Sequence, residues 1–167
     1  MAVIEVENLI KCYDGRNVVD GVSFAVDQGE IFGIVGPNGA GKTTTVESVS
    51  GLRQPDGGTI EVLGLDPQRD RYEVTQRVGV QLQESRLQDK IKVHEVLDLY
   101  ASFYDTPADW RSLLDRLGLE GKADARYSNL SGGQKQRLAV ALALVGSPEI
   151  AILDELTTGL DPQARRD

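Results

Sequence analysis

The chain has 167 residues, 40% of them hydrophobic and 26% charged, which is the balance of a single globular domain with enough apolar material for a core. Its formal net charge of −8 argues against a protein that binds DNA or RNA, because such proteins neutralise phosphates with Lys and Arg. The single cysteine, Cys12, excludes an internal disulfide, and the absence of a signal-peptide pattern or of an apolar run of about 20 residues predicts a cytoplasmic protein.

Two early strands are predicted where apolar and polar residues alternate, at 3–9 and 18–27. The run from Glu30 to Val35 is apolar on both faces, which predicts a strand buried in a parallel sheet. The later pattern predicts, in chain order, a helix at about 41–50, a turn at 54–58, strands at 59–63 and 78–82, helices at 93–104, 107–117 and 131–145, and a strand at 150–153. Buried strands that alternate with helices indicate an α/β fold.

A glycine-rich loop lies between the apolar run at 30–35 and the helix that follows it. It comprises Gly36, Pro37, Asn38, Gly39, Ala40, Gly41, Lys42 and Thr43, and it matches the pattern G-x-x-x-x-G-K-[ST] in full. In that pattern, backbone N–H groups and a helix N-terminus surround the phosphates of a nucleoside triphosphate. We therefore expect Lys42 to reach the β- and γ-phosphates, Thr43 to hold Mg²⁺, and Thr44 to contact a phosphate oxygen.

Two carboxylates, Asp154 and Glu155, follow the apolar strand at 150–153. Ligands of α/β sheets bind at the carboxyl ends of strands, where this pair stands. Asp154 suits a magnesium ion, directly or through water, and Glu155 suits a water molecule that attacks the γ-phosphate. The alternative is a solvated acidic strand end, which the phosphate loop upstream disfavours.

A second helix start of the kind that binds anions lies much later in the chain. Ser131 is a favourable N-cap, and Gly132, Gly133 and Gln134 follow it before a long helical pattern. Such a helix start offers unpaired N–H groups to an anion. The chain thus has two helix starts suited to phosphate, and the second needs an explanation.

With these motifs in order, the chain resembles the nucleotide-binding domain of ATP-binding-cassette (ABC) transporters. The elements similar to the family's motifs are Tyr13 (adenine-stacking aromatic), Gly36–Thr43 (Walker A), Gln83 (Q-loop), Leu130–Gln134 (signature), Leu153–Glu155 (end of Walker B) and Gly159–Asp161 (D-loop). The resemblance covers essentially the whole chain, and the motifs stand in the family's order.

The resemblance implies ATP and Mg²⁺ as cofactors and two such domains packed head to tail. The signature of one domain, here Ser131–Gln134, would then close over the γ-phosphate held by the other, which would explain the second helix start. Gln83 is expected to contact the metal and the γ-phosphate and to join Glu155 and Lys42 in catalysis, and Asp161 to line the nucleotide site. A transmembrane permease is the further partner, no nucleic acid is expected, and the protein would sit on the inner face of the cell membrane through the permease.

The resemblance also implies the fold: one ABC ATPase domain over 1–167, with a P-loop NTPase core, a mostly parallel sheet, an N-terminal antiparallel β part and a helical insertion. We expect the nucleotide-binding core with its β part at 1–83, the helical subdomain with the signature helix at 84–145, and the Walker B strand and D-loop at 146–167. His94, the single histidine, lies outside every motif and is expected to be structural.

The chain departs from the family in three places. The family usually has a histidine that contacts the γ-phosphate some tens of residues beyond the D-loop, and the sequence ends before it, at Asp167. We therefore expect a C-terminally truncated part of a longer protein; hydrolysis is expected of the full-length protein and is left open for this chain. Leu156 stands where the family usually has proline, and Gln81 takes a strand position that is more often apolar.

Stretches at 29–33, 62–67 and 157–166 resemble the drug- and antibiotic-export branch of the family (ABC-2 type), whose permease is a separate polypeptide. They predict a subunit that hydrolyses ATP to power export of a small molecule. Two alternatives stay open: a soluble ABC ATPase that acts on ribosomes, and a nucleotide-binding remnant without turnover.

Overall fold

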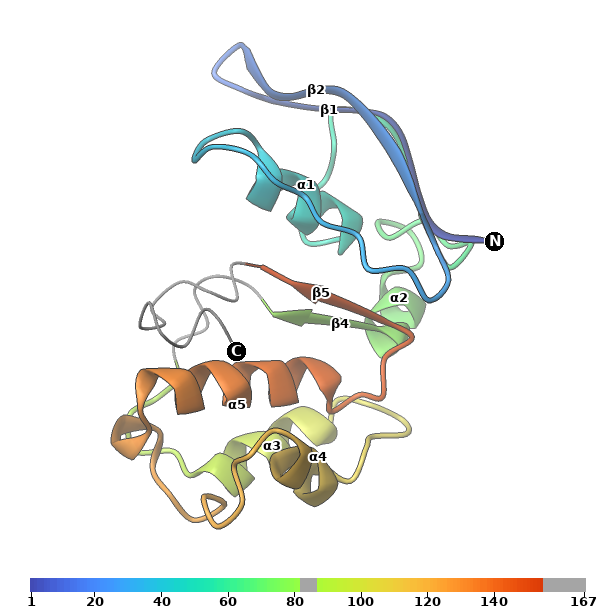
Figure 1. The fold of residues 1–167 in the computed structure, drawn as a ribbon. Helices are drawn as coiled ribbons and strands as arrows, with labels where there is room; N and C mark the ends of the chain where they lie inside the picture. Colours follow the sequence, from blue (N-terminus) through green and yellow to red (C-terminus); the bar gives the residue numbers. More distant parts are fainter. Residues whose placement is uncertain (82–86, 155–167) are drawn as a thin grey trace. The chain divides into compact units, whose positions relative to one another are not determined.

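The computed structural model describes residues 1–81 and 87–154 (Figure 1). The chain divides into two compact units, 1–75 and 76–167, and each is described by itself. Within the described residues, the first unit has an antiparallel sheet and the second a parallel pair of strands, so the fold is mixed α/β as expected. None of the described helices is long and apolar enough to cross a bilayer.

The first unit is built on an antiparallel sheet of order β2-β1-β3. Strands β1 (Ala2–Tyr13) and β2 (Arg16–Asp27) form a hairpin, and β3 (Gly57–Val62) pairs with the other edge of β1. Asp14 and Gly15 between β1 and β2 both have positive φ, 49° and 76°, as a tight hairpin turn requires. The buried apolar residues of the sheet are Ile4, Val6, Leu9, Val19, Val26, Ile60 and Val62.

The prediction of a strand at Glu30–Val35 is wrong. The segment forms no regular secondary structure, and Ile31 and Val35 are 100% and 92% exposed. A strand that is apolar on both faces needs parallel neighbours. The described ladders of this unit are antiparallel, and the parallel strands belong to the second unit, so the run has no ladder partner within its own unit. Phe32 stacks instead on Phe24 of β2, with ring centroids 5.1 Å apart.

The strands predicted at 78–82 and 150–153 are confirmed as β4 (Val78–Gln81) and β5 (Ile150–Leu153), and the two pair in parallel in the second unit. Helix α5 (Gly132–Leu144) packs on this pair. The approach is close, because a Cβ on Gly79 would lie 1.9 Å from the carbonyl oxygen of Ala143. Glycine is therefore required at this point of β4.

Three helices of the second unit share one apolar core. They are α3 (Val93–Ala101), α4 (Trp110–Arg116) and α5, and a 3₁₀ turn, η1 (Tyr127–Asn129), precedes α5. Trp110 is buried, and its Nε1 donates to the Asp98 Oδ1 at 2.7 Å. The core is formed by Val93, Val96, Leu97, Trp110, Leu113, Leu114, Leu119, Leu130, Leu138, Ala141, Leu142 and Val145.

The helix predictions are confirmed with shifted ends. Helix α4 begins later than the predicted 107 because Asp109 is its N-cap and accepts the N–H of Arg111 at 3.1 Å. Helix α2 (Arg71–Arg77) runs directly into β4. The predicted helices at 41–50, 93–104, 107–117 and 131–145 correspond to α1 (Lys42–Val49), α3, α4 and α5.

Candidate functional site

The phosphate-loop sequence leads into α1 with a backbone that only glycine allows. Gly41 is the N-cap of α1 and has a left-handed φ of 84°. A Cβ on Gly41 would lie 2.5 Å from the carbonyl oxygen of Val18, so both conformation and space require glycine here. No side chain caps α1. The helix therefore presents the positive end of its dipole without a local side-chain acceptor, as an anion site requires.

Lys42, the first residue of α1, folds back onto its own loop. Its Nζ donates to the carbonyl oxygens of Gly36 at 2.8 Å and of Pro37 at 3.0 Å. The ammonium group is thus held among the residues that would surround a phosphate. Thr43 and Thr44 follow in the first turn of α1 and are half-buried.

The second helix start, at α5, is capped in both directions. The Ser131 Oγ accepts the N–H of Gln134 at 3.3 Å, and the Gln134 Oε1 accepts the N–H of Ser131 at 2.9 Å. This is a capping box. Within the part of the chain that the structure describes, no hydrogen bond uses the N–H groups of Gly132 and Gly133. Two adjacent donors therefore remain at the helix start for an anion from outside the unit.

Arg137, which the sequence did not single out, holds the first turn of α5. Its Nη1 donates to the carbonyl oxygens of Leu117 and Gly118, both at 3.2 Å, and its Nε to that of Gly133 at 3.4 Å. The guanidinium thereby joins the end of α4 to the turn that carries the glycines. Its spacing gave no signal for the contacts with Leu117 and Gly118, because these residues lie 20 and 19 positions away in the sequence.

Asp154 closes β5 and is buried, with 7% of its surface exposed. Its N–H donates to the carbonyl oxygen of Gln81 at 3.0 Å, which extends the pairing of β4 with β5 by one residue. Gln81 is buried as well, at 6%. Both polar side chains end a parallel pair, where ligands of α/β folds bind.

Three of the predicted site residues, Gln83, Glu155 and Asp161, lie outside the described residues. The residues that the structure describes contain no group of three or more His, Cys, Asp or Glu side chains that could hold a metal ion. The side chain of His94 makes a contact within the second unit, where its Nδ1 lies 3.0 Å from the carbonyl oxygen of Ala123.

Tyr13 ends β1 and is 38% exposed. The Arg53 Nη1 donates a hydrogen bond to the Tyr13 Oη. The Arg53 guanidinium pairs with Glu47 as well, and this contact raises the pKa of Arg53 further above its usual value. Arg53 is a second residue that sequence reasoning missed.

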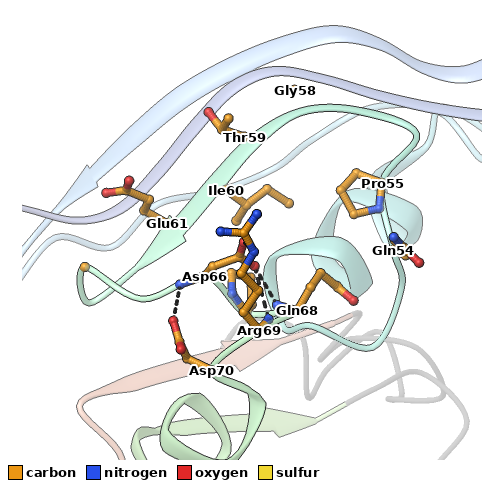
Figure 2. Close-up of a pocket in the computed structure, with 12 residues that line it drawn as sticks. Gln54, Pro55, Gly58, Thr59, Ile60, Glu61, Asp66, Gln68, Arg69 and Asp70 are labelled. Carbon is orange, nitrogen blue, oxygen red and sulfur yellow. Dashed lines mark hydrogen bonds and ion pairs between the residues drawn. The ribbon is translucent and has the colours of Figure 1, made fainter.

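A cleft of about 940 Å³ lies in the first unit beside β3 (Figure 2). Two contacts link residues of its lining: the Asp70 Oδ2 accepts the backbone N–H of Asp66 at 3.0 Å, and the Arg69 Nε lies 3.5 Å from the Asp66 Oδ2. The predicted site residues do not line it. The lining residues are Gln54, Pro55, Gly58, Thr59, Ile60, Glu61, Gly64, Asp66, Pro67, Gln68, Arg69 and Asp70.

The comparisons of this chain with known proteins agree on one family. The sequence profile described as "ABC transporter" matches residues 19–158. The chain is 46% identical over 171 residues to "Nod factor export ATP-binding protein I" of Burkholderia pseudomallei (strain K96243), a match that covers 99% of this chain and 56% of that protein. It is 44% identical over 168 residues to the protein of the same name from Rhizobium meliloti (strain 1021), covering 97% and 50%. The chain thus spans about half the length of these curated relatives.

Solved structures agree with this family. "Structure of ATP binding subunit of ABC transporter" matches with a TM-score of 0.85 and 30% identity over 98% of this chain and 70% of that one. CbiO1 from Clostridium perfringens, described as part of the ABC transporter complex cbiONQ, matches with a TM-score of 0.83 and 31% identity over 97% and 68%.

Proposed function

Because the chain belongs to the ABC transporter family, as an ATP-binding domain, we propose that the full-length protein hydrolyses ATP to power export of a small molecule through a separate membrane permease. The observation that carries this proposal is the start of α1. Gly41 leaves the helix without a side-chain cap, and the Lys42 Nζ donates to carbonyl oxygens of the loop that precedes the helix. The relatives' name, which includes export, supports the direction of transport.

In this proposal the N–H groups of the loop 36–41 and of the first turn of α1 hold the phosphates of ATP, and Lys42 neutralises them. Thr43, Asp154 and Gln83 are the proposed contacts of Mg²⁺, which supplies charge neutralisation at the γ-phosphate when it is bound. Glu155 would polarise the attacking water. Thr44 would contact a phosphate oxygen.

The start of α5 would serve a second copy or a related domain. Ser131 and the N–H groups of Gly132 and Gly133 would meet the γ-phosphate held by the partner, with the dipole of α5 behind them. Asp161 would line the same interface. The open donors of the two glycines support this assignment, because the capping box leaves them without a partner among the described residues.

We further propose that the protein is cytoplasmic and peripheral on the inner face of the membrane, where the permease holds it. The division into a core at 1–83, a helical subdomain at 84–145 and the Walker B and D-loop part at 146–167 belongs to the same proposal. The relation of CbiO1 to a transporter complex supports a permease partner of this kind.

The test is ATP binding by the Lys42→Ala variant of the full-length protein, measured by calorimetry with Mg²⁺. Loss of a charge-assisted contact to phosphate should weaken binding by about tenfold or more. Lys122→Ala is the control, because it removes an exposed lysine outside both helix starts. Equal affinity of Lys42→Ala and wild type would refute the phosphate-loop assignment. ATP that stays bound without hydrolysis in the wild type would refute turnover and favour the nucleotide-binding remnant.

A further inference from the structure

Tyr13 is held at the end of β1 by two cations. The Arg53 Nη1 donates to its hydroxyl, and the Arg53 Cζ lies 5.5 Å from the ring centroid. The Lys11 Nζ lies 5.6 Å from the same centroid. Both distances lie within the range in which a cation attracts the face of an aromatic ring.

Arg53 is itself fixed to α1. Its Nε lies 2.6 Å from the Glu47 Oε2, and its backbone N–H donates to the Glu47 carbonyl oxygen at 3.0 Å. The carbonyl oxygen of Arg53 accepts the Gln68 Nε2 at 2.9 Å. Glu47 belongs to the helix that begins with Lys42. The side chain of Arg53 therefore connects the phosphate-loop helix to the ring of Tyr13.

A second set of contacts fixes the strand next to Tyr13. The Lys11 Nζ donates to the carbonyl oxygen of Gln54 at 2.9 Å and to the Asp56 Oδ1 at 3.0 Å. The Cys12 N–H donates to the Asp56 Oδ2 at 2.7 Å. The backbone that carries Tyr13 is thus tied to the segment after α1, and Arg53 adds the contact that orients the side chain.

We propose that Arg53 is a positioning residue for nucleotide binding, which orients the Tyr13 ring relative to α1 so that ring and phosphate loop fit the two ends of one nucleoside triphosphate. The inference rests on the proposed function, in which Tyr13 stacks on adenine. A ring fixed before binding does not have to be immobilised by the ligand. Arginine suits this task because its planar fork offers separate N–H donors to Glu47 and to Tyr13.

Two variants of the full-length protein separate orientation from stacking. Arg53→Met removes the guanidinium but keeps an aliphatic stem, and Tyr13→Phe removes the hydroxyl but keeps the ring. Calorimetry compares ATP with inorganic triphosphate, which has the phosphates but no base. Each variant should bind ATP about two- to tenfold more weakly, the range expected when one side chain must be immobilised on binding. Affinity for triphosphate should not change.

The double variant and a control complete the design. Because both substitutions break the same hydrogen bond, Arg53→Met with Tyr13→Phe should bind ATP no more weakly than the weaker single variant. Arg69→Met is the matched control, since it removes an arginine of the same unit whose side chain is 86% exposed. It should bind both ligands as the wild type does. If Arg53→Met does not fold, Tyr13→Phe alone carries the test.

Several results would overturn the proposal. Unchanged ATP affinity of Arg53→Met and Tyr13→Phe, with weakened binding in Tyr13→Ala, would refute the role of Arg53 and leave the proposed function intact. Unchanged ATP affinity of Tyr13→Ala would refute the stacking of Tyr13 on adenine, and with it the positioning role of Arg53. Equal losses for ATP and triphosphate would assign Arg53 to the stability of α1. None of these results would refute the proposed function, which is tested separately by ATP binding of Lys42→Ala and by ATP turnover of the wild type.

Discussion

Ser131 and Gln134 cap each other across the first turn of α5: the hydroxyl of Ser131 accepts one N–H at 3.3 Å and the amide oxygen of Gln134 accepts the other at 2.9 Å. The hydroxyl keeps its own proton for donation to another group. The two glycines between them keep their N–H groups free of hydrogen bonds to the described residues. One short turn is therefore a stable helix start that also leaves two N–H donors available.

Substitution of Ser131 should separate these two roles. Ser131→Ala removes the cap and should cost about 0.5–2 kcal/mol of folding free energy. Ser131→Asp retains a good N-cap, so its thermal midpoint should stay close to the wild type. Its carboxylate would repel the partner's γ-phosphate, and ATP turnover of the full-length protein should fall by about tenfold or more. An Asp variant with wild-type turnover would contradict the anion role.

Replacement of Gly79, the glycine of β4, should destabilise the second unit. In Gly79→Ala the new Cβ would meet the backbone of Ala143 at 1.9 Å, so α5 must move away from the sheet. Overpacking of this kind costs about 1–3 kcal/mol or more, measured as the free energy of unfolding in urea. Gly57→Ala is the control, because its Cβ would meet only the side chain of Ile10, at 3.4 Å. Equal stability of the two variants would disprove the close packing.

Asp56 should give the first unit a pH dependence. Its pKa is lowered mainly by the hydrogen bond from the Cys12 N–H and then by Lys11, against an opposing effect of desolvation. A carboxyl group whose folded pKa lies below its ordinary value of 3.8 stabilises the fold above that pH, and this contribution is lost as the pH falls through the folded pKa. Urea unfolding should therefore show Asp56→Asn less stable than wild type at about pH 6, with a smaller difference at about pH 3. A difference that does not change with pH would contradict this account.

The sequence predicted the elements whose cause is local. The start of α1 at Lys42 followed from the glycine spacing, and the start of α5 followed from Ser131, because caps and tight turns depend on neighbouring residues. The strand at 30–35 failed because its apolar pattern needs parallel neighbours that its own unit does not contain.

Two side chains of the candidate site show what spacing cannot reveal. Arg53 contacts Tyr13 across 40 positions of the chain, and Arg137 contacts Leu117 across 20. Neither partner has a periodic relation to its arginine, and exposed arginines are common on any surface. Only the folded arrangement shows that both arginines hold the elements that would contact nucleotide.

Glu155→Gln tests the composite site most directly in the full-length protein. Glu155 follows Asp154 in the sequence and lies outside the described residues, and the amide would keep the size of the side chain while it removes the base. ATP should then stay bound and hold two domains together, because the signature of each would contact the γ-phosphate of the other. Size-exclusion chromatography with ATP and Mg²⁺ should show a dimer. Adding Ser131→Asp should return the protein to a monomer, and a Glu155→Gln variant that binds ATP but stays monomeric would refute the assignment of the α5 start to a partner's phosphate.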